Sequence, residues 1–281
     1  MKVAYQGVRG AYSEEAALRH FGPGCEPLGL AFSEQVFEAV GSGRADCGLL
    51  PVENSIAGPV AANLDLFLKE EVFMIAETYL AIEHCLLGLP GAALESLRSV
   101  YSHPVALAQC RDFLAKHRLK AIPEYDTAGS AELVAARQTP GEAAIASRGC
   151  AGAYGLELLR ENIQTVRDNI TRFAVFVRRD KVPPGLKPEK TSLAFSVQHK
   201  PGALLDCLRR FADHGINLTR LESRPIPENP FAYVFLVDLL GGLEDAAVRG
   251  ALDELRREAG QLKVLGSYPL GVSPHASPRR A

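Results

Sequence analysis

Short apolar runs alternate with longer amphipathic segments from the first residues of the chain to about residue 170. Apolar runs of this length predict buried strands, and the segments with one polar face predict helices. We expect strands within segments 2–7, 28–32, 47–54, 119–125 and 142–147, and one or two more within 72–89. We expect helices within segments 13–21, 33–43, 58–70, 104–117, 128–137 and 150–159. Such alternation is typical of an α/β fold with mostly parallel sheets.

Local signals also predict where several of these helices begin and end. Ser13 and Ser33 each precede a glutamate and are predicted to be N-caps. Gly41 is predicted to lie just beyond the end of its helix, because glycine adopts the left-handed conformation needed there. Pro59 is predicted to lie in the first turn of the next helix, where its missing N–H costs nothing.

The pattern changes after residue 177. The stretch RRDKVPPGLKPEK is rich in proline and basic residues and has little to bury, so we expect a linker at 181–190. Residues 191–270 then read as strand, helix, strand, strand, helix and strand, the ferredoxin-like βαββαβ order. Residues 271–281 are expected to form a disordered tail.

Composition narrows the class of protein. With 281 residues, of which 47% are hydrophobic and 23% charged, the chain can bury a core in about two domains. A net charge of -2 gives no electrostatic footprint for nucleic acid. The six cysteines include no CxxC pair and are too sparse for a disulfide framework. With no signal sequence and no apolar run of about 18 residues, we expect a soluble cytosolic protein.

Polar residues precede the apolar strand predicted at 173–177. Asn169, Thr171 and Arg172 lie at its start, and polar groups at the edge of a buried sheet must find partners. In α/β folds those partners are often ligands. A second cluster, Asn54 and Ser55, follows the strand at 47–54; ligand binding and helix capping are equally good interpretations of it.

Further polar residues lie at the start of the helix predicted at 104–117. His103 precedes Pro104 and is interpreted as a turn or cap residue, and Cys110 as a small core residue. Gln109 lies on an apolar stretch and needs a partner if it is buried. We interpret Glu83 and His84 as structural, because nothing nearby supplies further ligands at metal spacing.

The loop YQGVRGAY, with Gly7 and Gly10, leads into a helix whose N-terminus favours anions, but a tight turn that needs glycine explains it as well. In the C-terminal module, Pro201 and Gly202 begin a helix whose free N–H groups can hold a carboxylate. Polar residues cluster on the strand that follows it. Ligand binding and subunit contact are equally good interpretations of that cluster.

Taken together, the segments PVENSIAG, YSHPVALAQC and NITRFAVF, followed by GALL and LESRP, closely resemble bacterial prephenate dehydratase with a regulatory ACT domain. The resemblance runs from Lys2 to about Leu270. It implies a catalytic domain at 1–180 with two lobes like those of type II periplasmic binding proteins, and an ACT domain at 191–270. Lobe one would hold about 1–75 and the 170s strand, and lobe two about 76–168, with the active site in the cleft between them.

The resemblance also implies the site residues. The catalytic residues would be Thr171, Arg172 and Phe173, and the substrate-binding residues Asn54, Ser55, Ser102 and Gln109. The phenylalanine site of the ACT domain would be formed by Gly202, Ala203, Leu204, Asn217, Leu218, Glu222, Ser223, Arg224 and Pro225. In this scheme Arg172 holds a carboxylate, Thr171 donates a hydrogen bond to the departing oxygen, and Phe173 excludes water.

The function implied by the resemblance is decarboxylating dehydration of prephenate to phenylpyruvate, a carbon–oxygen lyase reaction in phenylalanine biosynthesis. It implies no cofactor and no metal, L-phenylalanine as an allosteric effector, and a homodimer or homotetramer. Two alternatives stay open: arogenate dehydratase activity, and a non-catalytic amino-acid sensor. The intact Thr171, Arg172 and Phe173 triplet argues against the sensor, because a protein that only binds has no need of it.

Overall fold

The computed structural model describes the backbone of residues 1–226 and 229–272 and, outside 229–232, their side chains. The tail predicted at 271–281 therefore lies outside the described residues from position 273 onward. The chain folds into two compact units. The first unit holds residues 1–63 and 78–173, and the second holds 64–77 and 174–271.

One sheet of the first unit is formed by the N-terminal residues. Its strands β1 (Lys2–Gln6), β2 (Glu26–Leu30) and β3 (Cys47–Asn54) are parallel in the order β2-β1-β3, and β4 (Gly58–Pro59) pairs antiparallel with β3. The helices between them are α1 (Tyr12–Phe21), followed by a 3-10 turn (Gly22–Gly24), and α2 (Ser33–Gly41). Val3, Ala4 and Tyr5 are all buried, as expected for a parallel strand covered on both faces.

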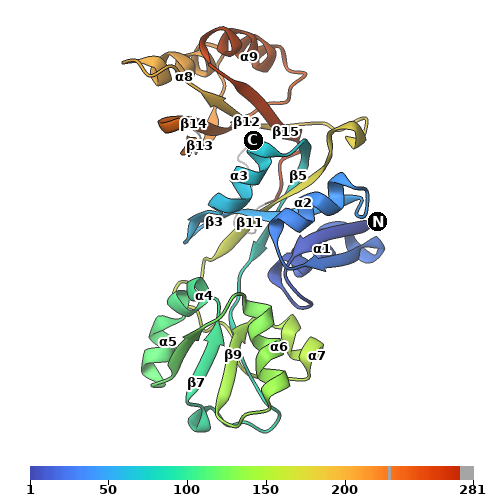
Figure 1. The fold of residues 1–281 in the computed structure, drawn as a ribbon, viewed down its shortest axis with the longest axis vertical. Coiled ribbons are helices and arrows are strands. Elements are labelled where there is room, and N and C mark those ends of the chain that lie inside the picture. The colour runs from blue at the N-terminus through green and yellow to red at the C-terminus, as the bar shows by residue number, and fades with distance from the viewer. Residues whose placement is uncertain (227–228, 273–281) are drawn as a thin grey trace, which may run out of the picture. The chain divides into compact units, whose positions relative to one another are not determined.

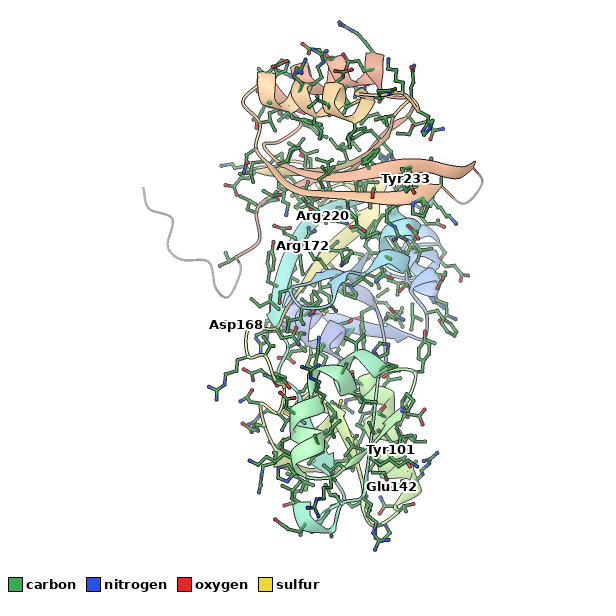
Figure 2. All side chains as sticks on the ribbon, turned by 90° about the vertical axis from the view of Figure 1, so that its left-hand side faces the viewer. Tyr101, Glu142, Asp168, Arg172, Arg220 and Tyr233 are labelled. Carbon is green, nitrogen blue, oxygen red and sulfur yellow. The ribbon has the colours of Figure 1, made fainter. Side chains whose placement is uncertain are left out.

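The other sheet of the first unit has five strands in the order β10-β6-β9-β7-β8. They are β6 (Cys85–Gly88), β7 (Ser99–Ser102), β8 (Lys120–Pro123), β9 (Glu142–Ala146) and β10 (Glu157–Arg160), with a 3-10 turn (Leu94–Ser96) before β7. The strand β7 pairs parallel with β8 and β9, and β6 pairs antiparallel with β9 and β10. Neighbouring strands are also joined by side chains, since Tyr101 Oη donates to Glu142 Oε1 at 2.7 Å (Figure 2).

Helices cover both faces of this five-stranded sheet (Figure 1). They are α4 (Pro104–Gln109) and α5 (Arg111–Lys116) on one face and α6 (Thr127–Arg137) and α7 (Gly149–Tyr154) on the other. Successive side chains of a strand point to opposite faces. Accordingly, Leu86 and Ile145 pack in the core with α4 and α5, whereas Leu87 and Ala144 pack in the core with α6 and α7.

Three elements pass from one unit into the other along the chain. These are α3 (Ala61–Lys69), β5 (Val72–Ala81) and β11 (Ile170–Arg178). The strand β11 ends in a 3-10 turn (Arg179–Lys181), and residues 182–189 form neither helix nor strand.

The second unit contains the C-terminal module in the predicted βαββαβ order. Its elements are β12 (Lys190–Ser196), α8 (Ala203–Asp213), β13 (Leu218–Ile226), β14 (Asn229–Leu240), α9 (Ala246–Glu258) and β15 (Leu262–Tyr268). The strand order is β13-β14-β12-β15, and Gly266 of β15 pairs with Met74 of β5. Residues of α8 and α9 pack on one face of this sheet through a core that includes Phe195 and Phe211 (Figure 1). The α/β fold class with a C-terminal βαββαβ module is confirmed.

Several local predictions were wrong. The N-caps of α1 and α2 are Ala11 and Phe32, so Ser13 and Ser33 lie inside their helices. The left-handed glycine after α2 is Gly43, with φ of 76°, whereas Gly41 is the last helical residue. Pro59 lies in β4 rather than in α3.

Two predicted helices were also too long. The helix expected at 104–117 is interrupted at Cys110 between α4 and α5. The helix expected at 150–159 ends at Tyr154, because Gly155 adopts a left-handed conformation and the chain continues as β10.

All six cysteines are free thiols, and five of them are buried. Among the described residues, none of the helices is long and apolar enough to span a membrane.

Candidate active site

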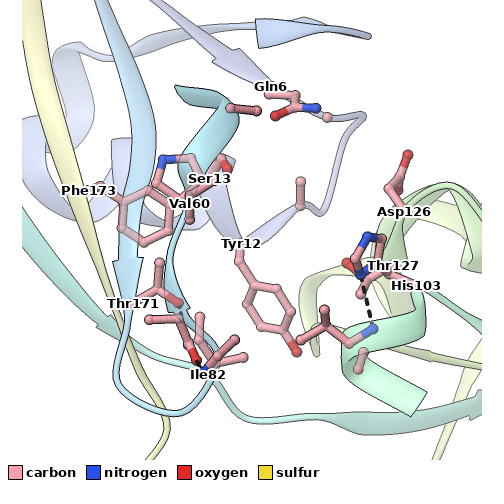
Figure 3. A pocket seen from close by; sticks show the side chains of 18 of the residues that line it. Gln6, Tyr12, Ser13, Val60, Ile82, His103, Asp126, Thr127, Thr171 and Phe173 are labelled. Atoms are coloured by element: carbon pink, nitrogen blue, oxygen red, sulfur yellow. Dashed lines mark hydrogen bonds between the residues drawn. The ribbon is translucent and has the colours of Figure 1, made fainter. Parts of the chain in front are cut away.

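A cavity of about 620 Å³ lies within the first unit. It is lined by the loop after β1, the end of β3, the start of α3, the segment between β5 and β6, the start of α4, the start of α6 and the start of β11. Figure 3 shows Tyr12, Thr171 and Phe173 on its wall, with His103 and Asp126 also labelled. The volume is within the range of small-molecule sites in proteins.

The glycine loop turns the chain toward this cavity. Gly7 and Gly10 have φ values of 121° and 84°, which side chains with a Cβ rarely adopt. The helix α1 then begins at the cavity, and Ala11, its N-cap, has no side-chain acceptor to satisfy the first amide groups. An N-terminus without a cap carries a partial positive charge and N–H donors, which an anion can accept. Glu14 and Glu15 in the first turn offset part of that charge, and Glu14 already accepts the N–H of Gly10.

Asn54, at the end of β3, is the centre of a hydrogen-bond cluster. Its Oδ1 accepts the backbone N–H groups of Ile56, at 3.0 Å, and Ala57, at 2.8 Å. Its Nδ2 donates to Asn169 Oδ1 at 2.6 Å and to Thr171 Oγ1 at 3.0 Å. The structure therefore brings Asn54 and Thr171, both predicted site residues, into direct contact.

The cluster continues across the cavity wall. Asn169 Nδ2 donates to Gln109 Oε1 at 3.0 Å, and His84 Nε2 lies 2.8 Å from the same oxygen. His84 Nδ1 lies 2.9 Å from Tyr12 Oη. Gln109, predicted to need a partner, thus has two, and His84 lines the cavity rather than serving only as a structural residue.

Burial fixes the protonation of two members of this cluster. Burial lowers the pKa of His84, and the hydrogen bond to Gln109 opposes that shift in part. Burial also raises the pKa of Tyr12 well above its ordinary value. At neutral pH the imidazole is therefore neutral and the phenol keeps its proton.

Arg172 is not among the residues that line this cavity, and its role in holding a substrate carboxylate stays a prediction. Successive residues of a strand alternate between faces, so Thr171 and Phe173 line the cavity while Arg172, labelled in Figure 2, does not. The Arg172 guanidinium instead contacts Glu53 Oε2 from both Nε and Nη2, at 3.0 Å each. This pair is intact and mostly buried on the arginine side.

Two serines predicted to bind substrate are also placed elsewhere. Ser102 is fully buried, and its hydroxyl donates to the carbonyl of Ile145 at 2.6 Å. Ser55 holds the start of β11, accepting the N–H of Ile170 at 2.9 Å and donating to the carbonyl of Asp168. Neither serine is among the residues that line this cavity, and substrate contact by Ser55 and Ser102 stays a prediction.

Other residues flanking the cavity act as helix caps. The His103 Nδ1 accepts the N–H of Val105 at 3.2 Å, which confirms the prediction of a cap residue. The carboxylate of Asp126 accepts the N–H of Gly129 and caps α6. Cys110 is fully buried in the core, as predicted.

The predicted effector residues fall into two groups in the second unit. Gly202, with φ of 84°, is the N-cap of α8, followed by buried Ala203 and by Leu204 at the edge of the core. Leu218, Glu222, Ser223, Arg224 and Pro225 lie along β13, directly after Asn217. No described cavity joins Gly202, Ala203 and Leu204 to this strand.

The charged residues of β13 already have partners. Glu222 accepts from Arg220 at 2.6 Å. Arg224 is paired with Asp65 of α3. An effector that binds these residues would have to share or replace those ion pairs.

No group of three histidine, cysteine, aspartate or glutamate side chains able to hold a metal ion occurs within residues 1–226 and 229–272.

The fold and the site define an α/β protein with a small-molecule cavity and a ferredoxin-like C-terminal module. The family model for prephenate dehydratase matches residues 3–181, and the model for the ACT domain matches residues 191–257. Arogenate dehydratase 2 of Petunia hybrida is 41% identical over 283 residues, covering 96% of this chain and 72% of that protein. The chain belongs to the prephenate dehydratase family and carries a C-terminal ACT domain.

Two solved structures share the fold of this chain. The prephenate dehydratase of Arthrobacter aurescens, solved in complex with L-Phe, has a TM-score of 0.86 at 32% identity and covers 96% of this chain and 90% of its own. The protein GqqA, described as a novel type of quorum quenching acylase, also has a TM-score of 0.86, at 38% identity over the whole of both chains.

Three residues of the cavity cluster were not among the predicted site residues: Tyr12, His84 and Asn169. Asn169 had a signal in the sequence, because it lies beside Thr171 at the mouth of a buried strand. Tyr12 had a weaker signal in the sequence, the glycine loop that precedes it. His84 was considered in the sequence and interpreted as structural, because its partners Gln109 and Tyr12 lie 25 and 72 positions away.

Proposed function

We propose that this protein converts prephenate to phenylpyruvate with loss of carbon dioxide and water, and that L-phenylalanine regulates it through the ACT domain. The observation that carries the proposal is the Thr171 hydroxyl on the cavity wall, which accepts a hydrogen bond from Asn54 Nδ2 at 3.0 Å. A hydroxyl that accepts from a neighbour still has its own hydrogen to donate.

The direction of that hydrogen bond follows from the backbone. The amides of Ile56 and Ala57 can only donate, so Asn54 must turn its oxygen toward them and its nitrogen toward Thr171. Within the described part of the chain, no acceptor is recorded for the Thr171 hydrogen. It is therefore available to a ligand, and in this proposal it donates to the departing hydroxide.

Gln109 is held in the same way. Its Oε1 accepts from Asn169 and faces His84, so its amide hydrogens remain for a ligand carboxylate. No lysine or arginine occurs among the described residues that line the cavity. The dianionic substrate would therefore be held by neutral donors and by the uncapped N-terminus of α1.

The reaction needs little else from the protein. The bond between the ring carbon and its carboxylate breaks, the electron pair moves through the ring, and hydroxide leaves from the opposite ring carbon. One proton converts that hydroxide to water, so prephenate dianion and a proton give phenylpyruvate anion, carbon dioxide and water. Thr171 is too weak an acid to protonate hydroxide outright, and its role is to stabilise the developing charge by hydrogen bonding.

Removal of water from the substrate would assist both steps. Phe173 is 1% exposed and lies on the cavity wall beside Thr171. An apolar wall strips solvent from the ring carboxylate and strengthens every hydrogen bond inside the site.

The regulatory part of the proposal rests on the ACT domain and on the relative solved with L-Phe. Within residues 1–226 and 229–272, Gly202, Ala203 and Leu204 line none of the three cavities described. In this proposal they bind L-phenylalanine together with the residues of β13 from a second subunit. A homodimer or homotetramer in the cytoplasm is therefore part of the proposal.

A direct test compares kcat/KM for prephenate and arogenate on the same preparation, with and without L-phenylalanine. Arogenate is the rival substrate because Arogenate dehydratase 2 of Petunia hybrida is a relative. Higher kcat/KM for prephenate, lowered by L-phenylalanine, supports the proposal. Higher kcat/KM for arogenate would show that arogenate, rather than prephenate, is the substrate. Binding of either compound without turnover would favour the amino-acid sensor.

A further inference from the structure

A chain of five polar side chains runs along the wall of the cavity. It consists of Asn54, Asn169, Gln109, His84 and Tyr12. Asn169 is the one member that does not line the cavity, and it is 1% exposed. Its carbonyl also accepts the N–H of Ile82 at 2.7 Å, which fixes its backbone beside the cavity.

The backbone amides that Asn54 accepts set the direction of the hydrogen bonds along this chain of side chains. Because Asn54 Oδ1 accepts two backbone amides, its Nδ2 must donate to Asn169 Oδ1. The Asn169 amide can then present only its nitrogen to Gln109 Oε1. Each amide orientation thus follows from the one before it, and the first follows from N–H groups that cannot reverse.

The same logic determines the tautomer of His84. Since Gln109 presents its oxygen, His84 Nε2 must carry the hydrogen that lies between them. The neutral ring then has a lone pair on Nδ1, which lies 2.9 Å from the hydroxyl of Tyr12. The single hydrogen of that hydroxyl is shared between His84 Nδ1 and the carbonyl of Glu83, also at 2.9 Å, so the tautomer is set from the Gln109 side. Lowering of the His84 pKa by burial agrees with a neutral ring.

If the hydrogen bonds of this chain of side chains ran in the opposite direction, Gln109 would present a different group to a ligand. If Asn169 presented an acceptor to Gln109, that amide would turn its nitrogen inward and leave its carbonyl oxygen for the ligand. A carbonyl oxygen repels a carboxylate, whereas the N–H groups that it replaces bind one. The single buried amide of Asn169 therefore decides whether the Gln109 side of the cavity suits an anion.

We propose that Asn169 is a positioning residue that holds Gln109 as a donor to the substrate and His84 as the Nε2–H tautomer. This inference rests on the proposed function only for its effect on turnover. Its effect on the tautomer is a property of the protein without substrate, so the two can fail separately.

Two variants each introduce a carboxylate into this hydrogen-bond chain, but only one of them reverses the direction of its hydrogen bonds. Comparing them separates the effect of that direction from the effect of the added negative charge. In Asn169→Asp, the residue still accepts from Asn54 but faces Gln109 with an acceptor, so Gln109 turns and His84 must move its hydrogen to Nδ1. In Gln109→Glu, the residue still accepts from both neighbours, so His84 keeps its hydrogen on Nε2 while the two donors to the ligand are lost.

The experiment is nitrogen-15 NMR of histidine-labelled protein, which distinguishes the two ring tautomers, together with steady-state kinetics on prephenate. We expect Nε2–H in the parent and in Gln109→Glu, and Nδ1–H in Asn169→Asp. We also expect Asn169→Asp to lose about 10²-fold in kcat/KM, as misplacement of a binding group costs.

The control is Asn63→Asp, which buries a carboxylate in the first unit at a residue that does not line the cavity and that donates to the carbonyl of Pro51. An equal loss of kcat/KM in this variant would overturn the assignment to Asn169. A parent protein with Nδ1–H, or Asn169→Asp with an unchanged tautomer, would also overturn it. The tautomer of His84 in the parent protein can be measured even if a variant does not fold. If the tautomers behave as expected while prephenate is inert, the positioning role stands and the proposed function fails.

Discussion

The Arg224 guanidinium holds the carboxylate of Asp65 through two hydrogen bonds, 3.0 Å from Nε to Oδ1 and 2.7 Å from Nη2 to Oδ2. Asp65 lies in α3, and Lys263 Nζ donates to two carbonyls at the end of the same helix, those of Leu68 and Glu70. The first residues of α3 line the cavity. A single helix therefore connects residues held by the ACT domain to residues on the cavity wall.

This connection predicts that Asp65→Asn and Arg224→Gln weaken inhibition by L-phenylalanine. The concentration for half inhibition should rise several-fold, because α3 is no longer held by β13. Both side chains are partly exposed, so loss of the pair should lower the free energy of unfolding by less than about 1 kcal/mol. Inhibition curves for the parent and both variants measure the effect.

Arg210→Gln is the matched control, since Arg210 pairs with Glu258 at 2.6 Å inside the ACT domain and has no recorded contact with α3. Its inhibition curve should match that of the parent. Identical curves for all four proteins would contradict a role for the Arg224 and Asp65 pair in regulation.

The pairing of Arg172 with Glu53 makes a second prediction. Glu53→Gln should lower the free energy of unfolding by roughly 1–3 kcal/mol, because the buried guanidinium loses the charge of the Glu53 carboxylate that it contacts. The KM for prephenate should change little, because neither Glu53 nor Arg172 lines the cavity. Urea unfolding and steady-state kinetics measure the two effects, with Asp180→Asn in the exposed pair with Arg178 as the control. A large rise in KM without loss of stability would support Arg172 as a carboxylate ligand.

His84 makes stability depend on pH. Burial lowers its pKa in the folded protein, whereas the unfolded chain has a histidine pKa of about 6.5. As the pH falls below that value, the unfolded state gains a proton before the folded state does, so stability falls. Urea midpoints at pH 7.5, 6.5 and 5.5 should decline in the parent and decline less in His84→Gln. Parallel pH profiles for the two proteins would show that His84 is not buried as a neutral ring.

The hydrogen that Thr171 has available to donate gives a further prediction. Thr171→Val keeps the shape of the side chain but removes the donor, so kcat should fall on the order of 10²–10³-fold. Thr171→Ser keeps the hydroxyl and should retain most of the activity. Circular dichroism and the unfolding midpoint check that both variants fold, because loss of the hydrogen bond from Asn54 by itself lowers stability.

The broad fold could be predicted because each element of the chain has its own local pattern. The module from β12 to β15 could be predicted because its strands and its helices show different periods of hydrophobic residues along the sequence. The end of α7 had a signal in Gly155, whose left-handed conformation stops the helix, and the strand β10 after it was missed. Ser13 and Ser33 failed as caps because each helix begins before or at the serine itself.

The site was predictable only in part. Adjacent residues of a strand face opposite sides, which accounts for Thr171 and Phe173 lying on the cavity wall while Arg172 pairs with Glu53. Ser102 could not be placed, because its partner, the carbonyl of Ile145, lies 43 positions away on another strand. His84 could not be found for the same reason, since its role depends on contacts that only the folded chain creates.

The most direct test of the central claim is the rate of phenylpyruvate formation from prephenate by the parent protein, Thr171→Ser and Thr171→Val. The account predicts turnover by the parent, similar turnover by Thr171→Ser, and a loss on the order of 10²–10³-fold by Thr171→Val. A Thr171→Val variant with nearly the kcat of the parent would contradict the role of the Thr171 hydroxyl. A parent protein without action on prephenate would contradict the function itself.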